Sequence, residues 1–360
     1  MSHDVATTQP QGALLVGSVN YDDAETTMRA AADLMGPLLK RIPDGEPGKR
    51  FHWIMFQPDV LGQAEGIERV GEHPVPLRML DARPLRIADN VDPATLRLPP
   101  LGYAEAAVAS YEIFRRLRDE GVIAQRTGNQ GTRFQVSLPT PLAVVGAYFP
   151  PDQRAGFEPV YREAMYRELD AILDAIPHED LAVQWDNAVE FSIIEGVAPR
   201  GGRGASWWGD DVWAGLTERS ADQASRVPLD VEVGFHLCYG DVAEKHFIEP
   251  TDAGNLVRYA NMLTDASPRP ITWIHLPVPI ERDDDAYFAP LDDLRLGDDT
   301  ELYLGLVHRE DGAEGARRRI DTALRHVPAF GVATECGIGR APAGSTEGIL
   351  RTHAEVASAW

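Results

Sequence analysis

The stretch PVYREAMYRELDAILDAI at residues 159–176 is followed closely by LAVQWD at residues 181–186. In the first stretch the apolar side chains recur at helical spacing and share one face: Tyr161, Met165, Leu169, Ile172 and Leu173. The second is a short apolar run ending on Asp186, which is typical of a buried strand with a polar residue at its end. A helix that leads directly into a buried strand is half of a repeating α/β unit.

The same alternation of strand and helix continues along the chain. Further strands are expected at residues 13–18, 134–137, 143–148, 231–237, 271–275, 302–307 and 330–333, and further helices near residues 23–40, 103–120, 313–325 and 346–358. Such alternation favours an α/β fold with a parallel sheet, and about eight units in one chain predict a (β/α)8 TIM barrel. A doubly wound open sheet is the alternative, but no Gly-x-Gly-x-x-Gly turn supports it.

The barrel is expected to form one domain over residues 13–360, preceded by a flexible N-terminus at residues 1–12. The least regular stretch is residues 197–227, which is rich in glycine and contains Trp207, Trp208 and Trp213. We interpret it as a loop or lid between barrel strands, and an exposed insertion is an equal alternative.

The composition limits the classes of partner. The chain has 360 residues, is 44% hydrophobic and carries a net charge of −22, and a field of that sign repels nucleic acid and anionic lipid. The longest apolar runs have the length of strands, and no basic region precedes an apolar core at the N-terminus. We therefore expect a cytoplasmic protein that binds small molecules, with no nucleic-acid or membrane partner; its oligomeric state is left open.

The chain contains only two cysteines, and each lies in a short motif that looks like part of one metal site. Cys238 follows His236 by two residues in GFHLCYG, and Cys336 lies in TECGIG. On an extended strand a His-x-Cys pair places both side chains on one face, and imidazole with thiolate is a zinc-type donor set. A third donor far along the chain indicates a site that the fold closes, as in catalytic zinc sites. Cysteines that simply pack as small buried hydrophobes, or that form a disulfide, are the alternatives.

Several short motifs, in order, resemble the catalytic C-terminal barrel of the cobalamin-independent methionine synthase family, within the superfamily that includes uroporphyrinogen decarboxylase. The matching segments are Val16-Gly17-Ser18, Asp44-Gly45-Glu46 with Arg50 behind it, Val183-Gln184-Trp185-Asp186, His236-x-Cys238, Val307-His308 and Cys336-Gly337. The resemblance covers nearly the whole chain and implies a single TIM barrel.

The resemblance implies a zinc-dependent methyl- or alkyltransferase. A homocysteine-like substrate thiol would be held on Zn²⁺ as a thiolate and would attack a methyl or alkyl donor. The implied zinc ligands are His236, Cys238 and Cys336. The family's fourth ligand is a glutamate on the next strand, where this chain has His275; Glu281 is an alternative, and a hydrogen-bonding role for His275 next to the ligands is another.

The resemblance also assigns substrate-binding and catalytic roles. Glu46 and Asp186 are expected to hold the ammonium of an amino-acid thiol, with Ser18 near its carboxylate. His308 is expected to protonate the leaving group or shuttle a proton. Trp207 and Trp208 suggest a planar or aromatic substrate, although packing is an equal interpretation.

One departure from the family pattern affects the choice of substrate. Where the family has Asp-Glu-Pro, this chain has Asp186-Asn187-Ala188, so the second carboxylate is missing and the thiol acceptor stays open, as does the donor. Two other classes remain as alternatives: a metal-free lyase or decarboxylase on the same barrel, and a non-catalytic zinc- or thiol-binding protein.

Overall fold

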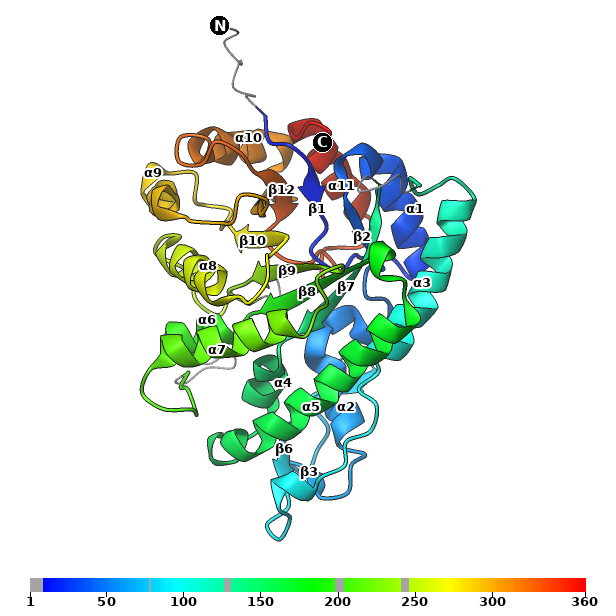
Figure 1. Ribbon diagram of the computed structural model, residues 1–360, viewed down its shortest axis with the longest axis vertical. Coiled ribbons are helices and arrows are strands. Elements are labelled where there is room, and N and C mark those ends of the chain that lie inside the picture. Colours follow the sequence, from blue (N-terminus) through cyan, green and yellow to red (C-terminus); the bar gives the residue numbers. More distant parts are fainter. Residues whose placement is uncertain (1–8, 78, 126–130, 198–203, 241–245) are drawn as a thin grey trace, which may run out of the picture.

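Eight parallel strands form a nearly closed barrel in the computed structural model, which describes residues 9–77, 79–125, 131–197, 204–240 and 246–360 (Figure 1). The strands are β1 (Ala13–Leu14), β2 (Arg41–Pro43), β7 (Arg133–Pro139), β8 (Leu181–Asn187), β9 (Glu232–Leu237), β10 (Trp273–Pro277), β11 (Glu301–Val307) and β12 (Gly331–Thr334). Their order is β1-β12-β11-β10-β9-β8-β7-β2, and a parallel bridge between Ala13 and Leu39 brings the two end strands together. The predicted (β/α)8 barrel is confirmed.

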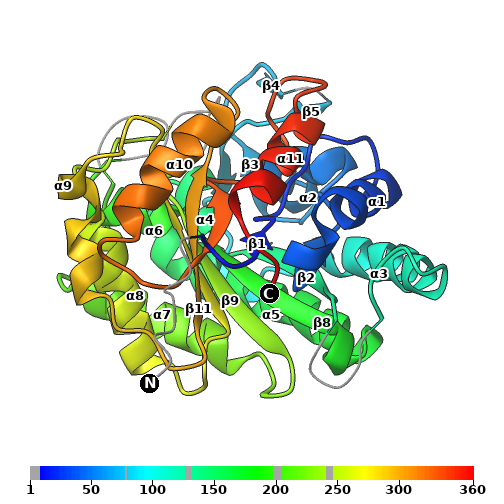
Figure 2. The ribbon, with the colours of Figure 1, turned by 90° about the horizontal axis from the view of Figure 1, so that it is seen from above.

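Helices surround these strands (Figure 2). They are α1 (Ala24–Met35), α2 (Gln57–Leu61), α3 (Tyr103–Asp119), α4 (Pro141–Tyr148), α5 (Pro151–Ala175), α6 (Val189–Ile194), α7 (Val212–Ser225), α8 (Gly254–Ala266), α9 (Asp285–Phe288), α10 (Gly312–Ala323) and α11 (Thr346–Val356). Two small hairpins, β3 (Ile67–Arg69) with β6 (Leu85–Ile87) and β4 (Pro76–Leu77) with β5 (Leu80–Asp81), belong to the long connection between β2 and β7. Within the described ranges, no helix combines the length and apolarity needed to cross a bilayer.

In the first half of the barrel, one strand predicted from the sequence is wrong and one strand was missed. Residues 143–148 were expected to form a strand but belong to helix α4, which begins at Pro141. A continuous apolar run fits a buried helix as well as a buried strand, and proline is well suited to the first helical position. The strand that completes the barrel is instead β2, which is only three residues long. All three residues are buried, but the charged Arg41 interrupts the apolar pattern by which a buried strand is recognised in a sequence.

The stretch at residues 197–227 is more regular than expected. Residues 198–203 lie outside the described part of the chain, but α7 occupies residues 212–225 and, with α6, belongs to the crossover between β8 and β9. At the N-terminus residues 1–8 are also outside the described part. Residues 11 and 12 are held by backbone hydrogen bonds to Phe330 and Ser358, so this part of the expected flexible segment is anchored.

The barrel interior is polar at its N-terminal end. Arg41, with a side chain 1% exposed, donates to Glu232 at 2.6 Å and to Glu301 at 2.7 Å, and it stacks over the ring of Trp273. Because strand side chains alternate in direction, every second residue of each strand points into the barrel, and the last of these residues form a layer at the C-terminal ends of the strands. In that layer Asp186 pairs in register with His236, and His236 with His275. Active sites of such barrels lie at this end.

Candidate metal centre

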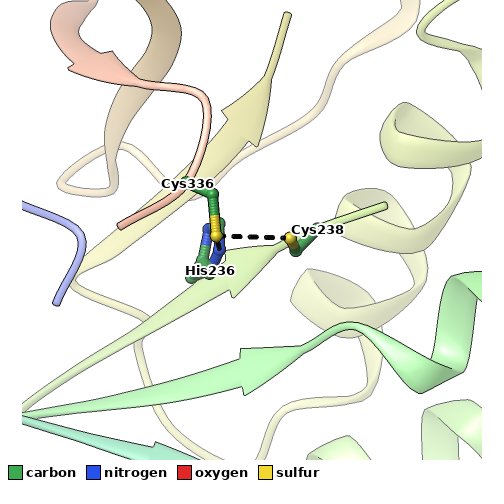
Figure 3. Close-up of side chains that lie close together, drawn as sticks. All are labelled: His236, Cys238 and Cys336. Carbon is green, nitrogen blue, oxygen red and sulfur yellow. Dashed lines mark hydrogen bonds between the residues drawn. The ribbon is translucent and has the colours of Figure 1, made fainter. Parts of the chain in front are cut away.

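His236, Cys238 and Cys336 converge at the C-terminal end of the barrel (Figure 3). The Sγ atoms of the two cysteines are 3.7 Å apart, Cys336 Sγ is 3.7 Å from His236 Nε2, and one ligand atom from each residue lies within 4.8 Å of the others. The two cysteines are not joined by a disulfide, so their closeness does not reflect one. His236 and Cys238 are each 3% exposed, and Cys336 is half-buried.

The spacing of these atoms fits a tetrahedral zinc ion. Zinc–sulfur bonds of about 2.3 Å at tetrahedral angles place two sulfurs about 3.8 Å apart, and a sulfur and a nitrogen about 3.6 Å apart. The observed 3.7 Å for both pairs is close to these values. Two thiols and one imidazole are also the donor types that zinc prefers, so the cluster can hold such an ion with a position left open.

Strand ends and tight loops place the two thiols. Cys238 directly follows β9, and the backbone N–H of Gly240 donates to its sulfur at 3.2 Å. Cys336 follows β12, where the Thr334 hydroxyl donates to the Cys336 carbonyl at 2.7 Å. The next residue is Gly337, at which a Cβ would lie 2.4 Å from the Ser18 hydroxyl oxygen, so a side chain does not fit there.

Ser18 is placed beside the loop that carries Cys336. Its carbonyl accepts from the N–H of Ile338 at 2.8 Å, and its hydroxyl accepts from the N–H of Gly339 at 3.3 Å. The structure therefore brings this predicted substrate-binding residue to the same rim as the thiols.

His275, predicted as the fourth ligand, lies against His236 rather than among the three clustered ligand atoms. Its Nδ1 is 2.7 Å from Nδ1 of His236, and its Nε2 is 3.0 Å from the carbonyl oxygen of Thr334. Burial lowers the pKa of His275 to about 3, and burial also holds the pKa of His236 well below its usual range, so both rings are neutral at pH 7. Glu281, the alternative, lines the cavity beside the centre.

Two buried carboxylates, Glu46 and Asp186, face the same end of the barrel. Burial raises the pKa of Glu46 to about 7, with Arg50 opposing the shift and Asp44 adding to it. Burial and the nearby charge of Glu46 raise the pKa of Asp186 well above its usual range. Burial and mutual repulsion disfavour the ionised forms of these two carboxyl groups, and a bound cation would stabilise those ionised forms.

Glu46 has a strained backbone, with φ of 54° in the left-handed region. Its N–H donates to Asp44 at 2.9 Å, and Asp44 is itself fixed by Arg50 at 2.6 Å and by the Ser110 hydroxyl at 2.7 Å. Such strain persists where the surroundings over-determine it, as at binding sites. The sequence motif indicated Glu46 but not this supporting role of Asp44.

A cavity of about 580 Å³ opens beside the metal centre, lined by residues that include His308, Glu335, Cys336 and Arg340. His308 donates from Nε2 to the Val278 carbonyl at 2.9 Å, and burial lowers its pKa to about 4. Its Nδ1 therefore carries a lone pair, and this atom lies 3.9 Å from a carboxylate oxygen of Glu335.

Two residues near the site were missed by sequence reasoning. Arg340 lies 3.9 Å from the sulfur of Cys336, and its charge acts on both Glu46 and His236. Trp53 lies beside Asp186 and has a φ of 54°, which is unusual for an aromatic residue. An arginine four residues after the second cysteine was a usable signal, whereas nothing local marks Trp53.

The two tryptophans predicted to bind substrate are engaged in the helical layer. Trp207 donates from Nε1 to Glu158 at 2.6 Å, and Trp208 packs against Gly215 and under Arg219. These contacts match the packing interpretation.

Asn187 also faces the helical layer. Its amide donates to the Tyr259 hydroxyl at 3.0 Å and to the Ser220 hydroxyl at 3.4 Å. Because Asp186 points inward, its neighbour must point outward. An asparagine here therefore changes the packing behind the strand and removes no charge from the barrel interior.

The fold and the cluster define a parallel β/α barrel with a Cys₂His group at its C-terminal rim that can hold a metal ion. No protein-family model and no curated protein matches the sequence. Three similar solved structures carry the same fold. A putative vitamin-B12-independent methionine synthase from Listeria monocytogenes is 15% identical, with a TM-score of 0.57 and 97% of each chain covered.

The second is a B12-independent methionine synthase from Shewanella sp. W3-18-1 in complex with selenomethionine, 14% identical, with a TM-score of 0.59 and 96% of each chain covered. The third is a methyltransferase from Methanosarcina mazei, 11% identical, with a TM-score of 0.53, covering 98% of this chain and 95% of that one. The structural neighbours are thus methionine synthase-like and methyltransferase proteins, as the sequence resemblance led us to expect, and at these identities the likeness establishes the fold.

Proposed function

We propose that this protein is a zinc-dependent transferase that moves a methyl or other alkyl group onto the sulfur of a small thiol. The observation that carries the proposal is the Cys238–Cys336–His236 cluster, whose sulfur–sulfur and sulfur–nitrogen separations of 3.7 Å match a zinc site with an open position. Its place at the C-terminal rim of a barrel shared with methionine synthase-like and methyltransferase neighbours supports the same chemistry.

Zinc bound at this centre would lower the pKa of a substrate thiol and present it as a nucleophilic thiolate. Around it, His236, Cys238 and Cys336 would hold the ion. His308, which lines the same cavity as Cys336 and has its Nδ1 atom 3.9 Å from Glu335, would shuttle the proton that the thiol loses.

The paired carboxylates favour an amino-acid thiol such as homocysteine. Glu46 and Asp186 would bind its ammonium, which relieves their mutual repulsion and the cost of burying charge. Ser18 would contact the carboxylate end. Because Asn187 points away from the barrel interior, the departure from Asp-Glu-Pro does not argue against this substrate.

Metal content and thiol alkylation together test the proposal. Protein expressed with zinc should contain about one zinc per chain, and Cys238→Ser, Cys336→Ser and His236→Ala should lose it. With homocysteine as acceptor and methyl iodide as a simple electrophile, zinc-loaded protein should accelerate formation of methionine, measured by mass spectrometry.

Two results would oppose the proposal. Wild-type protein without stoichiometric metal after zinc supplementation would leave a metal-free enzyme on this barrel as the better interpretation. Stoichiometric zinc without any acceleration, across homocysteine, cysteine and 2-mercaptoethanesulfonate, would indicate a zinc- or thiol-binding protein instead.

A further inference from the structure

The two buried histidines of neighbouring strands form a directed hydrogen-bond chain. His236 on β9 and His275 on β10 are register partners, 3% and 0% exposed, with 2.7 Å between their Nδ1 atoms. The Nε2 atom of His275 lies 3.0 Å from the carbonyl oxygen of Thr334, at the end of β12. Since β11 separates β10 from β12 in the sheet, this contact crosses the barrel interior.

The carbonyl oxygen sets the direction of the whole chain. A carbonyl accepts hydrogen bonds only, so Nε2 of His275 must carry the hydrogen, and Nδ1 of this neutral ring is then an acceptor. The hydrogen in the 2.7 Å contact therefore belongs to Nδ1 of His236. That leaves a lone pair on Nε2 of His236, the atom that lies 3.7 Å from the sulfur of Cys336.

We infer that His275 is a positioning residue for the metal centre, which fixes the tautomer and orientation of His236, and that it is not itself a metal ligand. Both of its nitrogens are already engaged, one by His236 and one by Thr334. Ligating histidines commonly donate their second N–H to a carboxylate, a carbonyl or a water, and here a neutral imidazole takes that place.

A positioning role for His275 affects the net charge and the coordination number of the zinc site. The inference rests on the proposed zinc site, in which two thiolates would balance the charge of the ion. A carboxylate ligand at position 275 would add a negative charge and fill the fourth position. A neutral histidine that stays outside the ligand set does neither, so the site would bind an incoming thiolate in the open position without opposing it electrostatically.

X-ray absorption spectroscopy of the zinc-loaded wild-type protein tests the ligand set directly. In the wild-type protein we expect two sulfur ligands and one imidazole ligand. A wild-type site with two imidazole ligands, one of which is lost in His275→Leu, would overturn the inference. In His275→Leu the same sulfur and imidazole shell should remain at one zinc per chain, whereas His236→Leu should take up no stoichiometric zinc.

Zinc affinity, measured by competition with a chelator, tests the positioning. His275→Leu should bind zinc about 10–100-fold more weakly than wild type, as other losses of such partners do. His275→Asn should recover most of the affinity, because its Oδ1 can take the place of Nδ1 as acceptor. Equal affinity in wild type and His275→Leu would also overturn the inference. A wild type that takes up no zinc would instead fail the proposed function, and the two failures are therefore distinguishable.

Discussion

The sulfur atoms of Cys238 and Cys336 lie 3.7 Å apart although 98 residues separate them in the sequence. Cys238 follows β9 and Cys336 follows β12, with β10 and β11 between those strands in the barrel. Closure of the barrel and inward loops at its C-terminal end bring the two thiols together across this gap. The two sulfurs are not joined by a disulfide.

The two thiols should differ in reactivity when metal is absent. Cys336 is half-buried and Cys238 is 3% exposed, so in metal-free protein iodoacetamide should modify Cys336 first, as seen by peptide mass spectrometry. Added zinc should protect both residues, because ligation occupies the sulfur lone pairs. Cys336→Ser is the control, in which Cys238 should remain slow. Modification of both cysteines at unchanged rates with zinc would contradict a shared site.

Replacement of Glu46 should make stability depend less on pH. The pKa of Glu46 in the folded state, about 7, exceeds the ordinary glutamate value of 4.5, so the folded state binds an extra proton between these values and wild-type stability falls as pH rises through that window. Glu46→Gln should match wild type near pH 4.5 and be more stable by roughly 2–3 kcal/mol above pH 7.

Urea unfolding of metal-free protein at several pH values measures this difference. Ser18→Ala, which removes a neighbouring polar group without a titrating proton, should differ from wild type by a constant amount. A pH-independent effect of Glu46→Gln would show that this carboxyl group titrates normally.

Binding of an amino thiol should depend on the carboxylates. In zinc-loaded protein, Asp186→Asn should weaken homocysteine about 10–100-fold, the range expected for loss of a charged hydrogen bond. The same variant should bind 4-mercaptobutanoate, which lacks the ammonium, as wild type does. Calorimetry gives both dissociation constants. Equal losses for the two ligands would mean that Asp186 supports the pocket without contacting the ammonium.

Arg41 should be a major contributor to the stability of the barrel. It is 1% exposed and pairs with Glu232 and Glu301, so Arg41→Met would leave two carboxylates without their buried partner and cost about 3–5 kcal/mol. Lys40 also contacts Glu301, but its side chain is 39% exposed, and Lys40→Met should cost at most about 1 kcal/mol. Chemical denaturation gives the free energy of unfolding of both variants. Similar losses of stability in the two variants would show that the burial of Arg41 does not make its ion pairs more important than those of Lys40.

Trp207 should act on stability and leave the site unaffected. Trp207→Phe removes the 2.6 Å hydrogen bond to Glu158, and we expect a loss of about 1–2 kcal/mol in the free energy of unfolding. Zinc content and homocysteine affinity should equal those of wild type. A selective loss of thiol affinity in a normally stable Trp207→Phe would restore the interpretation of this residue as substrate-binding.

Local patterning in the sequence determined the fold class and the positions of the main chemical groups. Helical spacing in residues 159–176 and the apolar run before Asp186 predicted α5 and β8, although α5 begins earlier, at Pro151. His236, Cys238, Asp186 and His308 were recognisable because each lies at or just after a strand end, and parallel strand ends meet at one rim. The expected number of strands was right only because two errors cancelled: residues 143–148 were wrongly counted as a strand, and the short β2 was missed.

Tertiary structure alone decided what those groups contact. His275 had the chemistry of a ligand, but its hydrogen-bond partners come from β9 and β12 and turn it toward His236 and Thr334. Asn187 and Trp207 face the helical layer, where residues from α7, α8 and α5 receive them. Residue type and spacing specify which side chains can do chemistry, whereas direction and partner depend on strands and helices distant in sequence, because each buried polar group must find its hydrogen-bond partner in the folded interior.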